Sequence, residues 1–183
     1  VIFFVLSGFL ITRILFLNAD EIQRTNSSAW PKIIRFIYRR SLRIFPIYFI
    51  LLFIGLVFNI SNFKELWPWL ISYTPNFYIM VKGQWLGTWD HLWSLAVEEQ
   101  YYLIFPYFIL FLTKKNYVRL FIIMISLGIF SRLIFYFIVP HDTIEKYWMF
   151  SYVNPLSAID CFGMGGLLAY FYHYDYHLLL KIA

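Results

Sequence analysis

The chain has 183 residues, of which 61% are hydrophobic, 23% are aromatic and only 14% are charged. In a typical globular domain about a quarter of the residues are charged, so this chain lacks the polar residues that a water-exposed surface needs. The formal net charge is +5, but the basic residues gather between apolar runs rather than on one folded face. This pattern argues against nucleic-acid binding and indicates an integral membrane protein.

Five apolar segments approach the length of about 20 residues that a helix needs to cross a bilayer. They lie at residues 1–17, 44–60, 93–112, 118–139 and 152–172. Their apolar residues run continuously rather than alternating, which favours helices over barrel strands. We therefore expect an all-α, polytopic transmembrane helical bundle of about five spans. Residues 1–183 form one membrane domain in this interpretation, and the chain begins inside a membrane helix.

The positions of lysine and arginine predict the orientation, because short loops rich in these residues stay on the cytoplasmic side. The connection at residues 18–43 is strongly basic, and residues 114–119 contain three further basic side chains. The connection at 61–90 has only two lysines. It is rich in tryptophan and broken by proline and glycine, so we expect it to lie along the membrane and to be partly re-entrant. Residues 18–32 are therefore predicted to be cytoplasmic and 61–89 external.

A basic motif precedes the second apolar segment, where Arg40 and Arg43 are three residues apart and share one helical face. Guanidinium groups bind phosphate through two hydrogen bonds, so this pair suits an anionic cofactor such as a phosphorylated thioester carrier. The alternative is an anchor that contacts the phosphates of membrane lipids. Charge alone does not choose between the two interpretations.

A second polar constellation begins the third segment, where His91, Glu98 and Tyr102 fall on one helical stripe. Carboxylates inside an apolar span are costly, so Glu98 or Glu99 is expected to face a polar cavity or a partner. Glu98 and His91 are the candidate catalytic residues, because both side chains can exchange protons. The alternative is a structural ion pair between the carboxylates and Arg132 in the next span.

No metal site is expected. Cys161 is the single cysteine, which excludes an intrachain disulfide and a zinc site of several cysteines. His173 and His177 have the spacing of metal ligands, but the sequence around them has no motif of acidic or thiol ligands arranged for a metal. We interpret these two histidines as an interfacial pair.

Small residues in the apolar segments indicate close helix packing. The three glycines in residues 163–166 follow no strand, so they are interpreted as packing positions rather than as a phosphate-binding loop. Ser7 and Gly8 are interpreted in the same way. Asp160, in the last segment, is a costly buried charge and remains a candidate site residue.

Three stretches of the sequence together resemble the acyltransferase family 3. They are IFFVLSGFLIT at residues 2–12, RRSLRIFPIY at 39–48 and HLWSLAVEEQYYLIFP at 91–106, and they follow the order found in that family. The resemblance implies a membrane-bound O-acyltransferase that moves an acyl group, commonly acetyl, from cytoplasmic acyl-coenzyme A to a hydroxyl of a cell-surface carbohydrate. It implies a larger bundle, in the inner or plasma membrane, in contact with lipid and with the carbohydrate acceptor.

The resemblance also assigns roles to residues. It implies that Arg40 and Arg43 bind acyl-coenzyme A and that Glu98 is the intramembrane carboxylate of the family. The family's best-known catalytic histidine belongs to a span that would precede Val1, and His91 belongs to a different motif. The family often has arginine two positions before an aspartate in the last of these spans, where this chain has Ala158.

Two other function classes remain open from the sequence. A transporter or flippase would use Glu98 and Glu99 as a proton relay without covalent chemistry. A non-catalytic membrane scaffold would need none of these side chains for chemistry.

Overall fold

The computed structural model describes residues 2–138 and 144–176, and these residues form helices and their connections without a strand. The α-helices are α1 (Ile2–Thr25), α2 (Trp30–Phe58), α3 (Phe63–Ile71), α4 (Pro75–Lys82), α5 (Leu92–Phe111), α6 (Tyr117–Ile138), α7 (Ile144–Val153) and α8 (Pro155–Tyr174). Short 3-10 helices lie at Ile60–Asn62, Gly87–Trp89 and Lys114–Asn116. The prediction of an all-α fold is confirmed.

Within residues 2–138 and 144–176, three stretches are long and apolar enough to cross a membrane, namely α1, α2 and the stretch Lys114–Ile138, which contains α6. Helices α5 and α8 have 20 residues each and carry polar side chains in their apolar sequences. The segments predicted at 93–112 and 118–139 closely match α5 and α6. A membrane-spanning bundle therefore agrees with the structure, while the count of five spans stays a prediction.

The boundaries predicted for the first two segments are wrong. Helix α1 continues to Thr25 and α2 begins at Trp30, so most of the basic residues assigned to a loop lie on helices. A helix can continue beyond the hydrocarbon core of the bilayer, because water solvates its charged side chains outside that core. Lys32 Nζ lies 2.5 Å from Glu21 Oε1 and joins the two helices beside their short connection.

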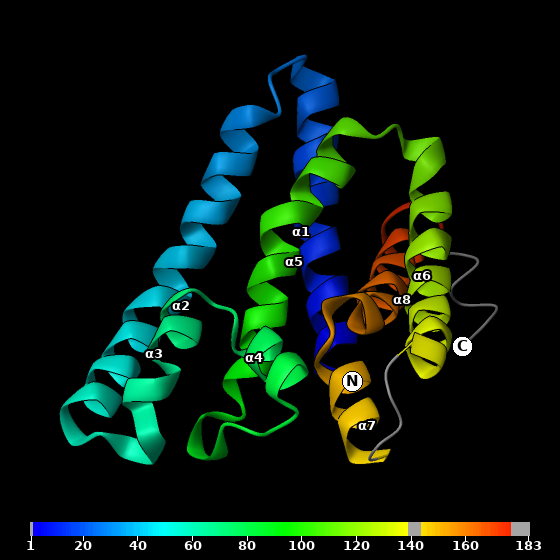
Figure 1. The fold of residues 1–183 in the computed structure, drawn as a ribbon. Helices are drawn as coiled ribbons and strands as arrows, with labels where there is room; N and C mark the ends of the chain where they lie inside the picture. Colours follow the sequence, from blue (N-terminus) through cyan, green and yellow to red (C-terminus); the bar gives the residue numbers. More distant parts are fainter. Residues whose placement is uncertain (1, 139–143, 177–183) are drawn as a thin grey trace.

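Both basic connections lie at one end of the bundle (Figure 1). The α1–α2 and α5–α6 connections are at the top of that view, whereas α3, α4 and α7 are at the opposite end. An ion pair of 2.6 Å between Lys114 Nζ and Asp20 Oδ1 joins the α5–α6 connection to α1 at this end. This arrangement agrees with the predicted alternation of the connections, and the side of the membrane on which each end lies stays a prediction.

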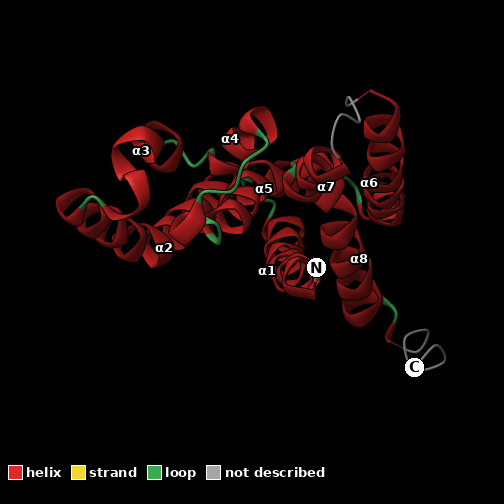
Figure 2. Cartoon of the chain, turned by 60° about the horizontal axis from the view of Figure 1, so that its bottom comes forward, coloured by secondary structure: helices red, strands yellow, loops and turns green. Residues whose placement is uncertain are grey.

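Helix α8 packs between α1 and α6, as the end-on view shows (Figure 2). A Cβ atom added to Gly8 on α1 would lie 2.6 Å from the carbonyl oxygen of Phe162, and one added to Gly165 would collide with the carbonyl oxygen of Val5. Gly166 faces the ring of Phe121 on α6 equally closely. The prediction that the glycines serve helix packing is confirmed.

Candidate functional site

Glu98 is a fully hydrogen-bonded carboxylate inside the bundle. Its side chain is buried, with 3% of its surface exposed. Ser7 Oγ on α1 donates to Glu98 Oε1 at 2.7 Å, and the Tyr102 hydroxyl donates to Oε2 at 3.0 Å. Tyr102 lies one turn further along α5, as the helical stripe predicted. Two hydroxyl donors thus reduce the cost of this buried carboxylate.

The alternative that Arg132 pairs with the carboxylates of α5 is wrong. Arg132 Nη2 on α6 lies 2.7 Å from Asp160 Oδ2 on α8 and also donates to the Ser157 carbonyl. The sequence left this partner unresolved, because helical periodicity does not tell which neighbouring helix a polar side chain faces. Asp160 therefore has a structural partner in the bundle.

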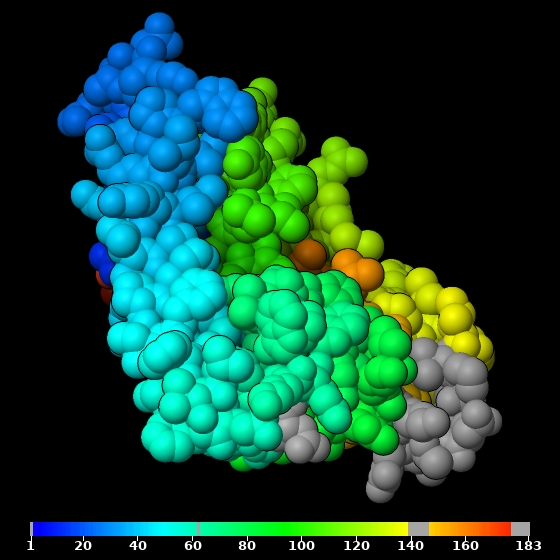
Figure 3. Space-filling view, turned by 60° about the vertical axis from the view of Figure 1, so that its left-hand side comes forward, coloured from blue at the N-terminus to red at the C-terminus, as the bar shows by residue number. Residues whose placement is uncertain are grey.

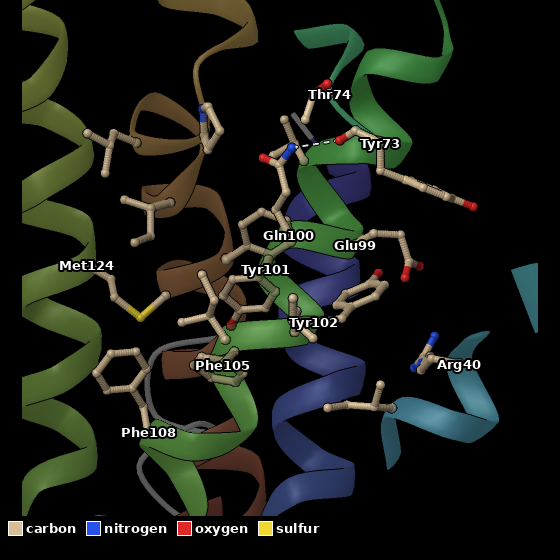
Figure 4. Close-up of a pocket in the computed structure, with 18 of the residues that line it drawn as sticks. Arg40, Tyr73, Thr74, Glu99, Gln100, Tyr101, Tyr102, Phe105, Phe108 and Met124 are labelled. Atoms are coloured by element: carbon tan, nitrogen blue, oxygen red, sulfur yellow. Dashed lines mark hydrogen bonds between the residues drawn. The ribbon is translucent and has the colours of Figure 1, made fainter. Parts of the chain in front are cut away.

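A cavity of about 730 Å³ lies against α2, α5, α6 and α8. Figure 3 shows a hollow in which the orange surface of α8 is visible between α5 and α6. The wall of the cavity is mainly apolar. Its charged side chains are Arg40 and Glu99, and Tyr73 and Gln100 are among its polar residues. Figure 4 shows Glu99 and Tyr73 on the side of α5 that faces Arg40. A mainly apolar cavity with a few convergent polar groups is typical of a ligand site.

Glu99 is one of the residues that line this cavity. Its Oε1 atom is buried, and no described residue forms a hydrogen bond with it. The two adjacent carboxylates thus have different surroundings, since each oxygen of Glu98 accepts a hydrogen bond from a hydroxyl and Oε1 of Glu99 accepts none among the described residues. The sequence placed Glu98 on the polar stripe and predicted that Glu98 or Glu99 faces a polar cavity or a partner, but it did not indicate that Glu99 lines the cavity. That position depends on the α3–α4 turn and on α2, which are distant in sequence.

The turn between α3 and α4 folds back against α5, while the predicted position of the second connection along the membrane stays a prediction. Gln100 Nε2 donates to the Tyr73 carbonyl at 3.0 Å and to Asn76 Oδ1 at 3.1 Å. On the other side, the ring of Tyr48 stacks on Tyr73 with centroids 4.2 Å apart, and its hydroxyl donates to the Leu70 carbonyl at 2.6 Å. These contacts fix Tyr73 at the wall of the cavity.

A second cavity, of about 320 Å³, lies at the basic end of the bundle. It is lined by Ile14, Asn18, Lys32, Arg35, Phe36, Arg39, Arg40 and Arg43. The structure therefore brings Arg40 and Arg43 to one pocket, together with three further cations. Arg40 lines both cavities, and its Cζ atom lies 5.2 Å from the ring centre of Tyr102. The basic pocket and the larger cavity thus share Arg40 in their walls.

The predicted histidines lie away from this junction. His91 is exposed immediately before α5 and lines neither of the two cavities. The structure does not bring it into contact with Glu98, and its catalytic role stays a prediction. His173 Nε2 lies 2.8 Å from Asp20 Oδ2 at the basic end, and its predicted partner His177 lies outside the described residues.

Comparisons with known proteins point to one family. Residues 1–182 match the family described as an acyltransferase domain. An uncharacterized protein of Haemophilus influenzae is 36% identical over 131 residues, which cover 62% of this chain and 49% of that protein. The peptidoglycan O-acetyltransferase OatA of Listeria monocytogenes is 32% identical over 146 residues, 71% of this chain and 22% of the relative.

A third relative is the O-acetyltransferase OatA of Staphylococcus aureus. It is 33% identical over 150 residues, which cover 69% of this chain and 23% of the relative. The chain therefore spans about half the length of the Haemophilus relative and under a quarter of the two acetyltransferases. No solved structure is significantly similar.

Proposed function

Because this chain belongs to the acyltransferase family 3, we propose that its protein is a membrane-bound O-acyltransferase that moves an acetyl group from acetyl-coenzyme A to a hydroxyl of a cell-surface carbohydrate. The observation that carries this proposal is the position of Arg40, which borders both the basic pocket and the intramembrane cavity. One pocket suits a polyanionic donor, and the other offers a water-poor space for acyl transfer.

The donor end of the site is the basic pocket. Coenzyme A carries several phosphate oxygens, and the fork of a guanidinium group matches such oxygens with paired hydrogen bonds. Arg40 and Arg43 face this pocket, with the side chains of Lys32, Arg35 and Arg39 beside them. In our proposal these residues hold the phosphates at the cytoplasmic end while the thioester arm extends past Arg40.

The reaction end is the apolar cavity. Bringing the thioester and the acceptor hydroxyl together in such a space excludes water, which would otherwise hydrolyse the donor. Glu98 and His91 keep their proposed roles in proton exchange. Glu98 would act from the α1–α5 interface, where Ser7 and Tyr102 orient it.

The acceptor class follows from the relatives. OatA of Listeria monocytogenes is named for peptidoglycan, a carbohydrate polymer of the cell surface. A carbohydrate hydroxyl outside the cell would approach from the end that carries α3, α4 and α7, opposite the basic connections (Figure 1). We therefore place the enzyme in the cell membrane, as a multi-pass protein with a cytoplasmic donor and an external acceptor.

Reconstitution of the full-length protein in liposomes tests this function. With radiolabelled acetyl-coenzyme A and an oligosaccharide of N-acetylglucosamine, we expect an acetyl ester on the sugar and release of one free thiol per ester. The thiol is counted with a colorimetric reagent, and the ester by chromatography before and after mild alkali. Movement of the intact sugar or of protons across the bilayer without ester formation would contradict the proposal and favour a transporter.

A further inference from the structure

Three cavity-lining residues have a buried polar atom without a hydrogen-bond partner among the described residues. These atoms are Oε1 of Glu99 and the hydroxyls of Tyr73 and Tyr101. Figure 4 shows Glu99 and Tyr73 together on the side of α5 that faces Arg40. Buried polar groups are nearly always hydrogen-bonded in folded proteins, so an unpaired set beside a cavity indicates a ligand that completes it.

Tyr73 is held in this position at a cost to its backbone. Its φ angle is +55°, in the left-handed region that residues with a side chain seldom adopt. The hydrogen bond from Gln100 to its carbonyl and the stacking of its ring on Tyr48 keep it there. Strained residues that are fixed from several sides are concentrated at functional sites.

Glu99 and Tyr73 have complementary hydrogen-bonding capacities. A carboxylate oxygen accepts a hydrogen bond, and a phenol hydroxyl can donate one. An alcohol does both at the same oxygen, so one hydroxyl can donate to Glu99 and accept from Tyr73. Both side chains line the same cavity, on the side of α5 that faces Arg40 (Figure 4).

We propose that Glu99 and Tyr73 form the subsite that binds the acceptor hydroxyl of the carbohydrate. The inference rests on the proposed function and names residues for its acceptor side. Tyr73 belongs to the segment that enters from the α3–α4 end, and Arg40 belongs to the donor pocket. The two substrates therefore meet between Arg40 and Glu99, where the hydroxyl oxygen can approach the thioester carbonyl.

Steady-state kinetics of the full-length protein test the subsite. The variants Glu99→Gln and Tyr73→Phe keep the size of each side chain while weakening one hydrogen bond. We expect each to raise the KM for the N-acetylglucosamine oligosaccharide about tenfold, as the loss of a hydrogen bond to a buried group predicts. The KM for acetyl-coenzyme A and its hydrolysis rate without sugar should stay at the parental values. Glu65→Gln and Tyr38→Phe, on exposed positions outside the cavity, serve as controls.

The possible results separate this inference from the proposed function. An unchanged KM for the sugar in both variants, with an active parent, would overturn the subsite and leave the function standing. A higher KM for both substrates, together with a loss of acetyl-coenzyme A hydrolysis, would also overturn the subsite. That pattern indicates a structural defect. A parent that forms no acetyl ester would contradict the proposed function, and the subsite with it. If one of the two variants does not insert into the membrane, the KM for the sugar in the other variant tests the subsite.

Discussion

Ser7 on α1 donates a hydrogen bond of 2.7 Å to Glu98 on α5, across 91 residues of sequence. The sequence presented Ser7 as a packing residue, but its hydroxyl is one of two donors to a buried carboxylate. Because α1 also packs closely on α8, this bond links the α1–α8 pair to the helix that carries Glu98 and the cavity residue Glu99. The position of α5 therefore depends on polar as well as apolar contacts.

Removal of either donor should destabilise the protein. Ser7→Ala and Tyr102→Phe each leave one oxygen of Glu98 buried without a partner, which costs about 1–3 kcal/mol. Thermal unfolding of the purified full-length protein in detergent should therefore begin at a lower temperature in both variants. Ser94→Ala is the matched control, because Ser94 Oγ bonds only to a carbonyl of its own turn. Unchanged unfolding of Ser7→Ala would show that this bond contributes little.

The arginine pair should discriminate between a phosphate site and a lipid anchor. In the double variant Arg40→Lys and Arg43→Lys the charge is kept but the planar fork is lost. We expect normal insertion and about a tenfold higher KM for acetyl-coenzyme A, because two charge-assisted hydrogen bonds weaken. Arg24→Lys, on α1 outside the basic pocket, is the control. A parental KM in the double variant would return the pair to the anchor interpretation.

The ion pair between Arg132 and Asp160 should couple α6 to α8. Asp160→Asn removes one charge of a pair in which Arg132 is partly exposed, so the expected loss of stability is about 1–3 kcal/mol. A double-mutant cycle with Arg132→Gln measures the coupling through thermal unfolding in detergent. Strictly additive effects of the two substitutions would mean that the pair contributes nothing to stability.

The glycine contacts between α1 and α8 should tolerate no added carbon. Gly8→Ala and Gly165→Ala would each place a methyl group against the backbone of the opposite helix. Both variants should yield much less folded protein in fluorescence-detected size-exclusion chromatography. Met164→Ala, at an exposed position of α8, should behave like the parent. Normal yield of both glycine variants would contradict the close approach of the two helices.

The orientation is tested by labelling single cysteines in intact cells. In a background carrying Cys161→Ala, a cysteine at Ser61 should react with an impermeant thiol reagent, and one at Ser27 should react only after the membrane is opened. Both positions are exposed in their connections. Labelling of Ser27 alone in intact cells would place the basic pocket on the outside and contradict a cytoplasmic donor.

Helix content and helix packing could be predicted because they follow from local patterns. The continuous apolar run at 118–139 predicted α6 closely, and the glycines at 163–166 predicted close packing. The beginning of α2 could not be predicted in this way, because its basic residues are equally compatible with a loop and with a solvated helix. These basic residues are spread over several turns of α2, and the helix brings Arg40 and Arg43 to the same pocket as Lys32.

The candidate site was less predictable than the fold. The stripe on α5 identified Glu98 and Tyr102 as neighbours, which the structure confirms. The role of Glu99 depends on Tyr73, which reaches α5 only because the α3–α4 turn folds back onto Gln100. Such a long-range contact leaves no periodic signal in either segment.

The most direct measurement is a pair of Michaelis constants determined for two variants of the full-length protein. If donor and acceptor meet at the junction of the two cavities, Arg40→Lys should raise the KM for acetyl-coenzyme A and leave that for the sugar unchanged. Tyr73→Phe should raise the KM for the sugar and leave the KM for acetyl-coenzyme A unchanged. A parent without acetyl transfer, or variants that change the same constant, would contradict the account.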